Sequence, residues 1–152
     1  MEAKQMNTAK AKWQVLVVDD HPIFRHGVSQ LLGTMPEVEI CGHAENALTA
    51  LEAVRRLKPE LALIDVSMPG INGIELLKLL LSEHPKLNVL IFSMHDESLY
   101  ALRALRAGAK GYVMKHTALE NIFDAVRKVM AGQNIRPCAQ LPPGVECRTR
   151  MA

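Results

Sequence analysis

The chain has 152 residues, of which 49% are hydrophobic, enough for one domain of ordinary size around a single core. Its longest apolar runs fall far short of the roughly 20 residues that a membrane span needs, and no apolar secretory segment lies near the N-terminus. The net charge of the chain is +2, and residues 1–12 and 133–152 contribute +2 each, which leaves −2 for residues 13–132. A mildly acidic body of this kind does not resemble a nucleic-acid-binding surface, which is basic.

Apolar runs of strand length alternate with segments of helical period, which is typical of repeated βαβ units around a parallel sheet. The second strand alternates polar and apolar residues and would suit an edge of the sheet. We therefore expect an α/β fold, a doubly wound, five-stranded parallel sheet with five helices. The predicted strands are 14–19, 37–43, 60–65, 87–93 and 111–114, and the predicted helices are 22–33, 46–57, 72–83, 97–107 and 118–131.

Several residues signal where the predicted helices begin and end. Pro22 suits the first turn of a helix, where its missing N–H is not needed. Asn72 and Thr117 each stand three residues before a glutamate, which is the spacing of a capping box. Gly108 and Gly132 follow helical runs at positions where a left-handed cap favours glycine.

The two ends of the chain lack the periodicity of residues 13–132, which we take as the folded domain. We interpret residues 1–12 as a flexible lead, and residues 133–152 as a disordered linker start or a non-native tail. The chain has three cysteines, an odd number without metal-ligand spacing, which argues against a disulfide framework. We therefore expect a protein of the reducing cytoplasm.

Four of the five predicted strands lead into polar or charged side chains. Asp19 and Asp20 follow the first strand, Asp65 ends the third, Ser93 ends the fourth, and Lys115 follows the fifth. Because ligands bind outside the carboxyl ends of the strands in an open parallel sheet, we expect these groups to form one site.

Three carboxylates in one partly buried pocket would repel one another by several kcal/mol, on the order of magnitude given by Coulomb's law. A divalent cation removes that repulsion, and Mg²⁺ suits a few carboxylates and a carbonyl because it retains water ligands. An aspartate beside Mg²⁺ and a lysine is a competent nucleophile towards a phosphoryl group and would form an aspartyl phosphate. Lys115 and the Ser93 hydroxyl would then stabilise the transferred oxygens.

Four motifs resemble a known family. They are residues 17–22 (VVDDHP), 65–73 (DVSMPGING), 91–93 (IFS) and 108–115 (GAKGYVMK), and the similarity extends over about 14–132. Together they resemble the receiver domain of two-component response regulators, in particular the NarL/FixJ subfamily, whose members usually have a C-terminal helix-turn-helix DNA-binding domain. The resemblance implies the flavodoxin-like strand order 2-1-3-4-5.

The resemblance also implies roles for the acidic residues. Asp65 would accept a phosphoryl group from a sensor histidine kinase. Asp19, Asp20, Asp65 and the backbone carbonyl of Ser67 would hold Mg²⁺.

For the site residues that are not acidic, the resemblance implies that the Ser93 hydroxyl moves towards the phosphoryl group. Tyr112 would be an aromatic switch that turns inward, and Lys115 the family's invariant basic residue. The signal would leave through the fourth helix, fifth strand and fifth helix. The resemblance also implies homodimerisation on phosphorylation, and transcription would be controlled through a DNA-binding domain absent from this chain.

Simpler interpretations compete for some of these residues. Asp19 and Asp20 alone could cap the helix that begins at Pro22. We take the six histidines as surface or core residues, except that His95, two residues beyond Ser93, could reach the phosphoryl group. The leucines of the fourth helix could belong to the core or to an output interface: Leu99, Leu102 and Leu105.

Two other functional classes would use a similar sheet. A phosphatase of the haloacid-dehalogenase class also forms an aspartyl phosphate, but its first strand ends in Asp-x-Asp, whereas Asp19 and Asp20 are adjacent. A flavodoxin-like flavin carrier needs a phosphate loop rich in Ser, Thr and Gly, whereas residues 20–22 would repel phosphate. We therefore interpret the chain as a signalling switch without an organic cofactor, not as a turnover enzyme.

Overall fold

The computed structural model describes residues 12–66, 68, 70–93 and 98–132, and it leaves out the side chains of 98–100 and 116–120. Both predicted end segments therefore lie outside the described residues, apart from Lys12. No helix in the described part is long and apolar enough to cross a membrane.

The described residues form a five-stranded parallel sheet between two layers of helices. The strands lie in the order β3-β2-β4-β5-β6, which is 2-1-3-4-5 along the chain and confirms the expected topology, with the alternating second strand at an edge. The strands are β2 (Trp13–Val18), β3 (Val38–Ala44), β4 (Leu61–Asp65), β5 (Asn88–Ser93) and β6 (Gly111–Met114). The helices are α1 (Pro22–Gly33), α2 (Ala47–Leu57), α3 (Gly73–Glu83), α4 (Ser98–Arg106) and α5 (Lys115–Met130).

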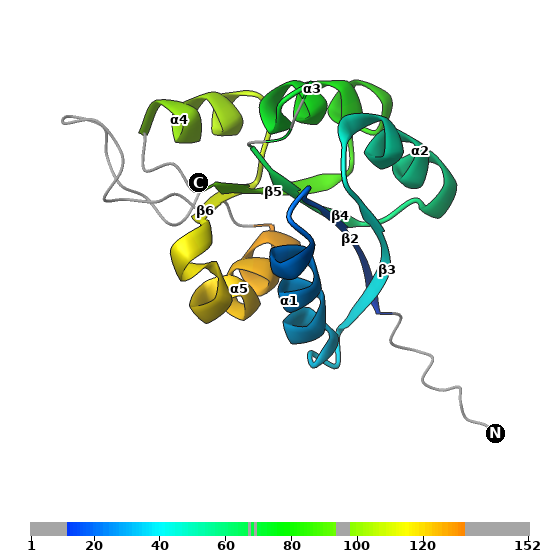
Figure 1. The fold of residues 1–152 in the computed structure, drawn as a ribbon, viewed down its shortest axis with the longest axis vertical. Helices are drawn as coiled ribbons and strands as arrows, with labels where there is room; N and C mark the ends of the chain where they lie inside the picture. The colour runs from blue at the N-terminus through cyan, green and yellow to red at the C-terminus, as the bar shows by residue number, and fades with distance from the viewer. Residues whose placement is uncertain (1–11, 67, 69, 94–97, 133–152) are drawn as a thin grey trace.

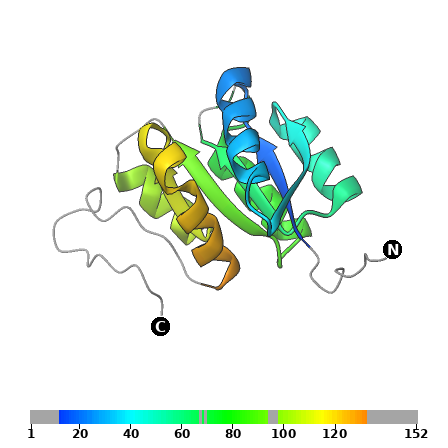
Figure 2. The same ribbon diagram turned by 90° about the horizontal axis from the view of Figure 1, so that it is seen from below.

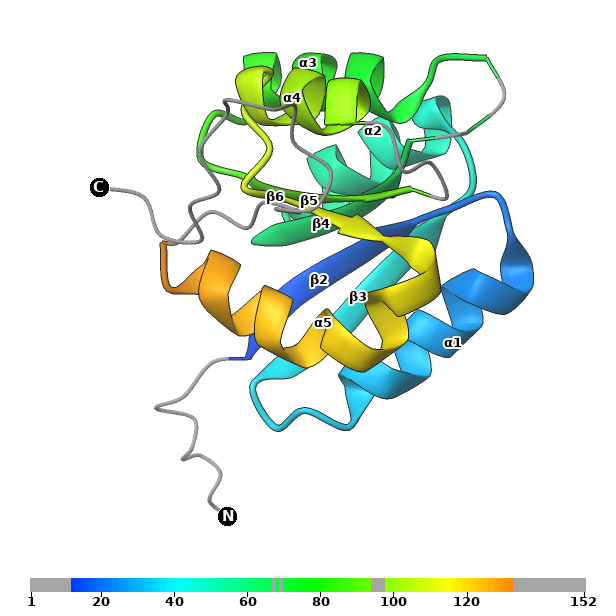
Figure 3. The same ribbon diagram turned by 90° about the vertical axis from the view of Figure 1, so that its left-hand side faces the viewer.

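The two layers of helices enclose two separate apolar cores. Helices α2, α3 and α4 cover one face of the sheet and α1 and α5 the other (Figures 1 and 3). Figure 2 shows α1 and α5 side by side on their face. In β4, Ala62 and Ile64 pack towards the first layer, whereas Leu61 and Leu63 pack towards the second. Burial on both faces explains why the central strands are continuous apolar runs in the sequence.

The helix ends confirm most of the local signals. Pro22 occupies the first turn of α1, and the Asn72 side chain accepts hydrogen bonds from two backbone N–H groups of α3, both at 3.0 Å. Gly108 and Gly132 have the expected positive φ angles, 113° and 91°. The cap predicted at Thr117 is wrong, because α5 begins at Lys115 directly after β6 and contains Thr117 in its first turn.

Helix α4 lies on the sheet through small side chains. Among its described side chains, only Ala101 and Ala104 are fully buried, and Leu102 and Leu105 are half-buried. The leucines are therefore at the rim of the core rather than in it. The side chain of Leu99 lies outside the described residues.

A histidine on the edge strand β3 should make stability depend on pH. Partial burial lowers the pKa of His43, and electrostatic repulsion from the neighbouring Arg25 and His26 lowers this pKa further. The unfolded chain therefore binds more protons below about pH 6.5, so protonation of His43 makes stability fall as pH drops through that value. We expect His43→Gln to lose less stability than the parent between pH 7.5 and pH 5.5 in urea unfolding. Equal losses in both proteins would contradict this assignment.

Candidate functional site

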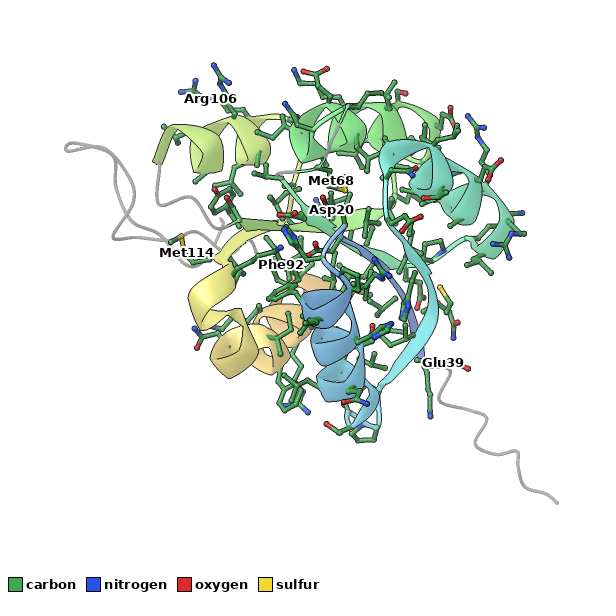
Figure 4. All side chains as sticks on the ribbon, in the orientation of Figure 1. Asp20, Glu39, Met68, Phe92, Arg106 and Met114 are labelled. Carbon is green, nitrogen blue, oxygen red and sulfur yellow. The ribbon has the colours of Figure 1, made fainter. Side chains whose placement is uncertain are left out.

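The carboxylates predicted to form a site lie together at the carboxyl edge of the sheet. Strands β2 and β4 are neighbours, with Val18 opposite Ile64, so Asp19 and Asp65 each follow one member of this pair. The Asp19 N–H donates to the Ala44 carbonyl of β3 at 3.0 Å, which fixes the start of the loop. Figure 4 shows Asp20 where the chain leaves β2, at the opposite end of the sheet from Glu39, which lies near the start of β3.

Lys115 joins these carboxylates from the other side. Its Nζ lies 2.7 Å from Asp19 Oδ2 and 3.5 Å from Asp65 Oδ2. The same Nζ lies 4.4 Å from the centroid of the Phe24 ring, in cation–π contact. Phe24 packs edge-on against Phe92 of β5 with the ring centroids 5.6 Å apart. The ring of Phe24 therefore supports the ammonium group of Lys115, a contact that the sequence did not predict.

The site is deeply buried and carries an excess of negative charge. The side chains of Asp19, Asp65 and Lys115 are 1%, 0% and 4% exposed, whereas Asp20 is 30% exposed. Two unit charges about 4 Å apart interact by about 4 kcal/mol at an effective dielectric constant of about 20. The single positive charge of Lys115 cannot neutralise three carboxylates, so these four groups retain a formal charge of −2. This charge matches a divalent cation.

The donor atoms also suit such a cation. Atoms of Asp19, Asp20, His21 and Asp65 all lie within 4.8 Å of one another. Three carboxylate oxygens are the hard ligands that Mg²⁺ prefers, and the partial exposure of Asp20 leaves room for water ligands. The residues present therefore fit Mg²⁺. Ser67, whose carbonyl we expected to be a further ligand, lies outside the described residues.

The remaining predicted site residues lie on the two strands beyond β4. Ser93, the last residue of β5, is fully buried and pairs in register with Met114 of β6. Tyr112 of β6 is 1% exposed and belongs to the core under α2, α3 and α4, so its ring is inside the molecule. Both residues also have further interactions within the protein. Residues 94–97, which include His95, lie outside the described residues.

His21 belongs to the site although sequence reasoning took it as an ordinary surface or core residue. Its Nδ1 lies 2.9 Å from Asp19 Oδ1, 3.2 Å from Asp20 Oδ1 and 3.2 Å from Lys115 Nζ. Its backbone N–H also donates to Asp19 Oδ1 at 2.8 Å. Its position directly after two strand-end aspartates was the signal that could have identified it.

Comparisons with known proteins agree with this geometry. The family model "Response regulator receiver domain" matches residues 15–127. The transcriptional regulatory protein DegU of Brevibacillus brevis is 36% identical over 121 residues, 80% of this chain and 51% of the relative. The nitrate/nitrite response regulator NarL of Escherichia coli K12 is 34% identical over 128 residues, 84% of this chain and 59% of the relative.

A solved structure, the receiver domain of NarL from Mycobacterium tuberculosis, has a TM-score of 0.76 and 35% identity to this chain. The match covers 80% of this chain and 98% of that one. By contrast, the chain spans only about half the length of the curated relatives that it matches. The chain thus belongs to the family of response regulator receiver domains of two-component systems.

Proposed function

We propose that Asp65 accepts a phosphoryl group from the phosphohistidine of a sensor histidine kinase, at a Mg²⁺ site formed with Asp19 and Asp20. The observation that carries this proposal is the position of the buried Asp65 carboxylate. It lies within 3.5 Å of Lys115 Nζ and within 4.8 Å of the other acidic ligand atoms. The Lys115 ammonium can therefore stabilise the aspartyl phosphate that Asp65 would form. The negative charges of the neighbouring aspartates favour a bound metal ion beside it.

The residues of the site have separate tasks in this transfer. A carboxylate oxygen of Asp65 attacks phosphorus, the P–O bond forms, and the P–N bond of the donor breaks, with its electron pair remaining on the imidazole. When bound, Mg²⁺ neutralises charge on the phosphoryl oxygens. Lys115 moves from its ion pair with Asp19 towards a transferred oxygen, and the Ser93 hydroxyl donates to another.

The added charge at Asp65 would then change the output surface of α4, β6 and α5. Tyr112 and Lys115 link the site to that surface, because both belong to the continuous segment β6–α5. We propose that the domain consists of residues 13–132 and works as a switch that slowly loses its own phosphoryl group. The relative DegU is a transcriptional regulatory protein, which supports an output in transcription. We further propose that another domain contacts DNA, that phosphorylation promotes homodimerisation, and that the protein acts in the cytoplasm.

The proposal predicts labelling by a small acyl phosphate. In acetyl phosphate and Mg²⁺, the intact mass should increase by one phosphoryl group, and EDTA should prevent the increase because the carboxylates then repel the donor. Borohydride reduces an aspartyl phosphate to homoserine, so peptide mass spectrometry of the reduced protein should find homoserine at position 65. Homoserine at position 19 or 20 would contradict the assignment of the acceptor.

The same samples separate this proposal from the two alternatives. Sustained hydrolysis of p-nitrophenyl phosphate, many turnovers per protein molecule, would favour the phosphatase. A yellow purified protein with a flavin absorption spectrum would favour the flavin carrier. For the switch, sedimentation in beryllofluoride and Mg²⁺ should show a larger species than in either reagent alone.

A further inference from the structure

The Nδ1 atom of His21, which faces the carboxylates, has both a hydrogen-bond donor and hydrogen-bond acceptors as neighbours. Nδ1 lies 3.2 Å from the Lys115 ammonium, which can only donate a hydrogen bond. It also lies 2.9 Å and 3.2 Å from oxygens of Asp19 and Asp20, which as ionised carboxylates can only accept. A ring nitrogen offers either a proton or a lone pair, so no tautomer suits all three contacts.

A divalent cation at this point removes the conflict. The Nδ1 lone pair and the carboxylate oxygens would then point at the same ion, and Lys115 would be released from His21. Adjacent ligands of an octahedral ion with bonds of about 2.1 Å lie about 3.0 Å apart. The distances from Nδ1 to the oxygens of Asp19 and Asp20, 2.9 Å and 3.2 Å, are close to that separation. The distance to Asp65 Oδ2, 3.8 Å, is longer.

We propose that His21 is a nitrogen ligand of the cation site and shifts its preference from Mg²⁺ towards transition-metal ions such as Mn²⁺. This inference rests on the proposed function, because it assumes that Asp19, Asp20 and Asp65 hold a divalent ion. Carboxylates alone suit Mg²⁺, whereas an imidazole ligand binds transition-metal ions more strongly than it binds Mg²⁺. The His21 side chain is 57% exposed, so it can turn towards the ion without breaking a packed core.

The His21 side chain can be replaced without removing a helix cap. His21 is the N-cap residue of α1, but its side chain forms no capping hydrogen bond. His26 provides a matched control on the same helix. It is exposed, its ring centroid lies 5.9 Å from that of His43, and it is outside the group of candidate ligands.

The test uses Mn²⁺ as the probe. Pulsed electron paramagnetic resonance of the Mn²⁺-bound parent should show coupling to a directly bound imidazole nitrogen, which His21→Ala loses and His26→Ala keeps. Calorimetric titration should show the Kd for Mn²⁺ rising at least about tenfold in His21→Ala, on the scale of ligand-shell mutations, while the Kd for Mg²⁺ changes little. His21→Asn, which offers an amide oxygen, should bind Mn²⁺ without nitrogen coupling.

The outcomes separate this inference from the function on which it rests. If the parent binds Mn²⁺ without nitrogen coupling and Asp20→Asn abolishes the binding, the role of His21 is overturned and the acidic metal site stands. Nitrogen coupling that persists in His21→Asn also overturns it. If the parent binds no Mn²⁺, or Asp20→Asn binds it equally well, the proposed metal site fails as well.

Discussion

Asp65→Asn should abolish phosphoryl labelling while making the metal-free protein more stable. The amide has nearly the same shape as the carboxylate but is too weak a nucleophile to form the acyl phosphate, so the mass increase should fall to background. Removing one of three clustered charges relieves repulsion from Asp19 and Asp20 but forfeits attraction to Lys115, which lies 3.5 Å away. At these distances the lost repulsion exceeds the lost attraction, so the free energy of unfolding should rise by about 2 kcal/mol at an effective dielectric constant of about 20.

The measurement is acetyl phosphate labelling by intact mass, combined with urea unfolding in EDTA. Asp124→Asn is the matched control, because Asp124 is a 70% exposed carboxylate on α5 that pairs with Lys128 at 3.0 Å. The control should label like the parent, and its stability should change little because exposed ion pairs contribute little. Full labelling of Asp65→Asn would contradict its role as acceptor. A less stable variant would contradict the excess of negative charge in the site.

Gly73→Ala should destabilise the protein by about 3 kcal/mol, at the upper end of the range for an overpacked core. A Cβ at position 73 would lie 2.7 Å from the Val66 Cα and closer still to the Asp65 carbonyl oxygen. Both are backbone atoms, so no side chain can rotate away, and the end of β4 must separate from the start of α3. The Gly73 N–H also donates to the Val66 carbonyl at 3.0 Å, a bond that this separation would strain.

The control is Gly27→Ala, the same substitution in α1, where a Cβ would meet no atom within 4 Å. Alanine in a helix interior is favoured over glycine by about 0.5–1 kcal/mol, so this variant should be more stable than the parent. Urea unfolding of both variants should therefore give changes of opposite sign. Because the displaced backbone holds Asp65, Gly73→Ala should also label more slowly. Equal stability of Gly73→Ala and the parent would contradict the close approach of α3 to β4.

The sheet and the acidic site could be predicted because their signals are local. Each central strand is a continuous apolar run, and a parallel sheet brings the ends of such runs to one edge. Asp19, Asp65 and Lys115 could therefore be grouped from strand ends alone, before any distance between them was known. The alternating second strand likewise indicated an edge, where β3 lies.

What the sequence did not reveal depends on contacts between distant segments. The capping signal at Thr117 is local, but β6 passes directly into α5 at Lys115, and tertiary packing decides where that helix begins. His21 was judged by the spacing of histidines along the chain, whereas its partners come from β4 and α5 as well as from its own loop. Phe24 supports Lys115 only because α1 and α5 lie on the same face of the sheet.

The small side chains beneath α4 have a consequence for the switch proposed above. Among its described side chains, α4 fully buries only the methyl groups of Ala101 and Ala104, whereas α3 buries Leu76, Leu77 and Leu80. Each methyl contributes about 0.8 kcal/mol of burial, against about 1.5–3 kcal/mol for a leucine. Among the described side chains, α4 is therefore held on the sheet by less apolar burial than α3. Under the proposed switch, a few new hydrogen bonds at Asp65 would be comparable in free energy with the apolar contact that positions α4.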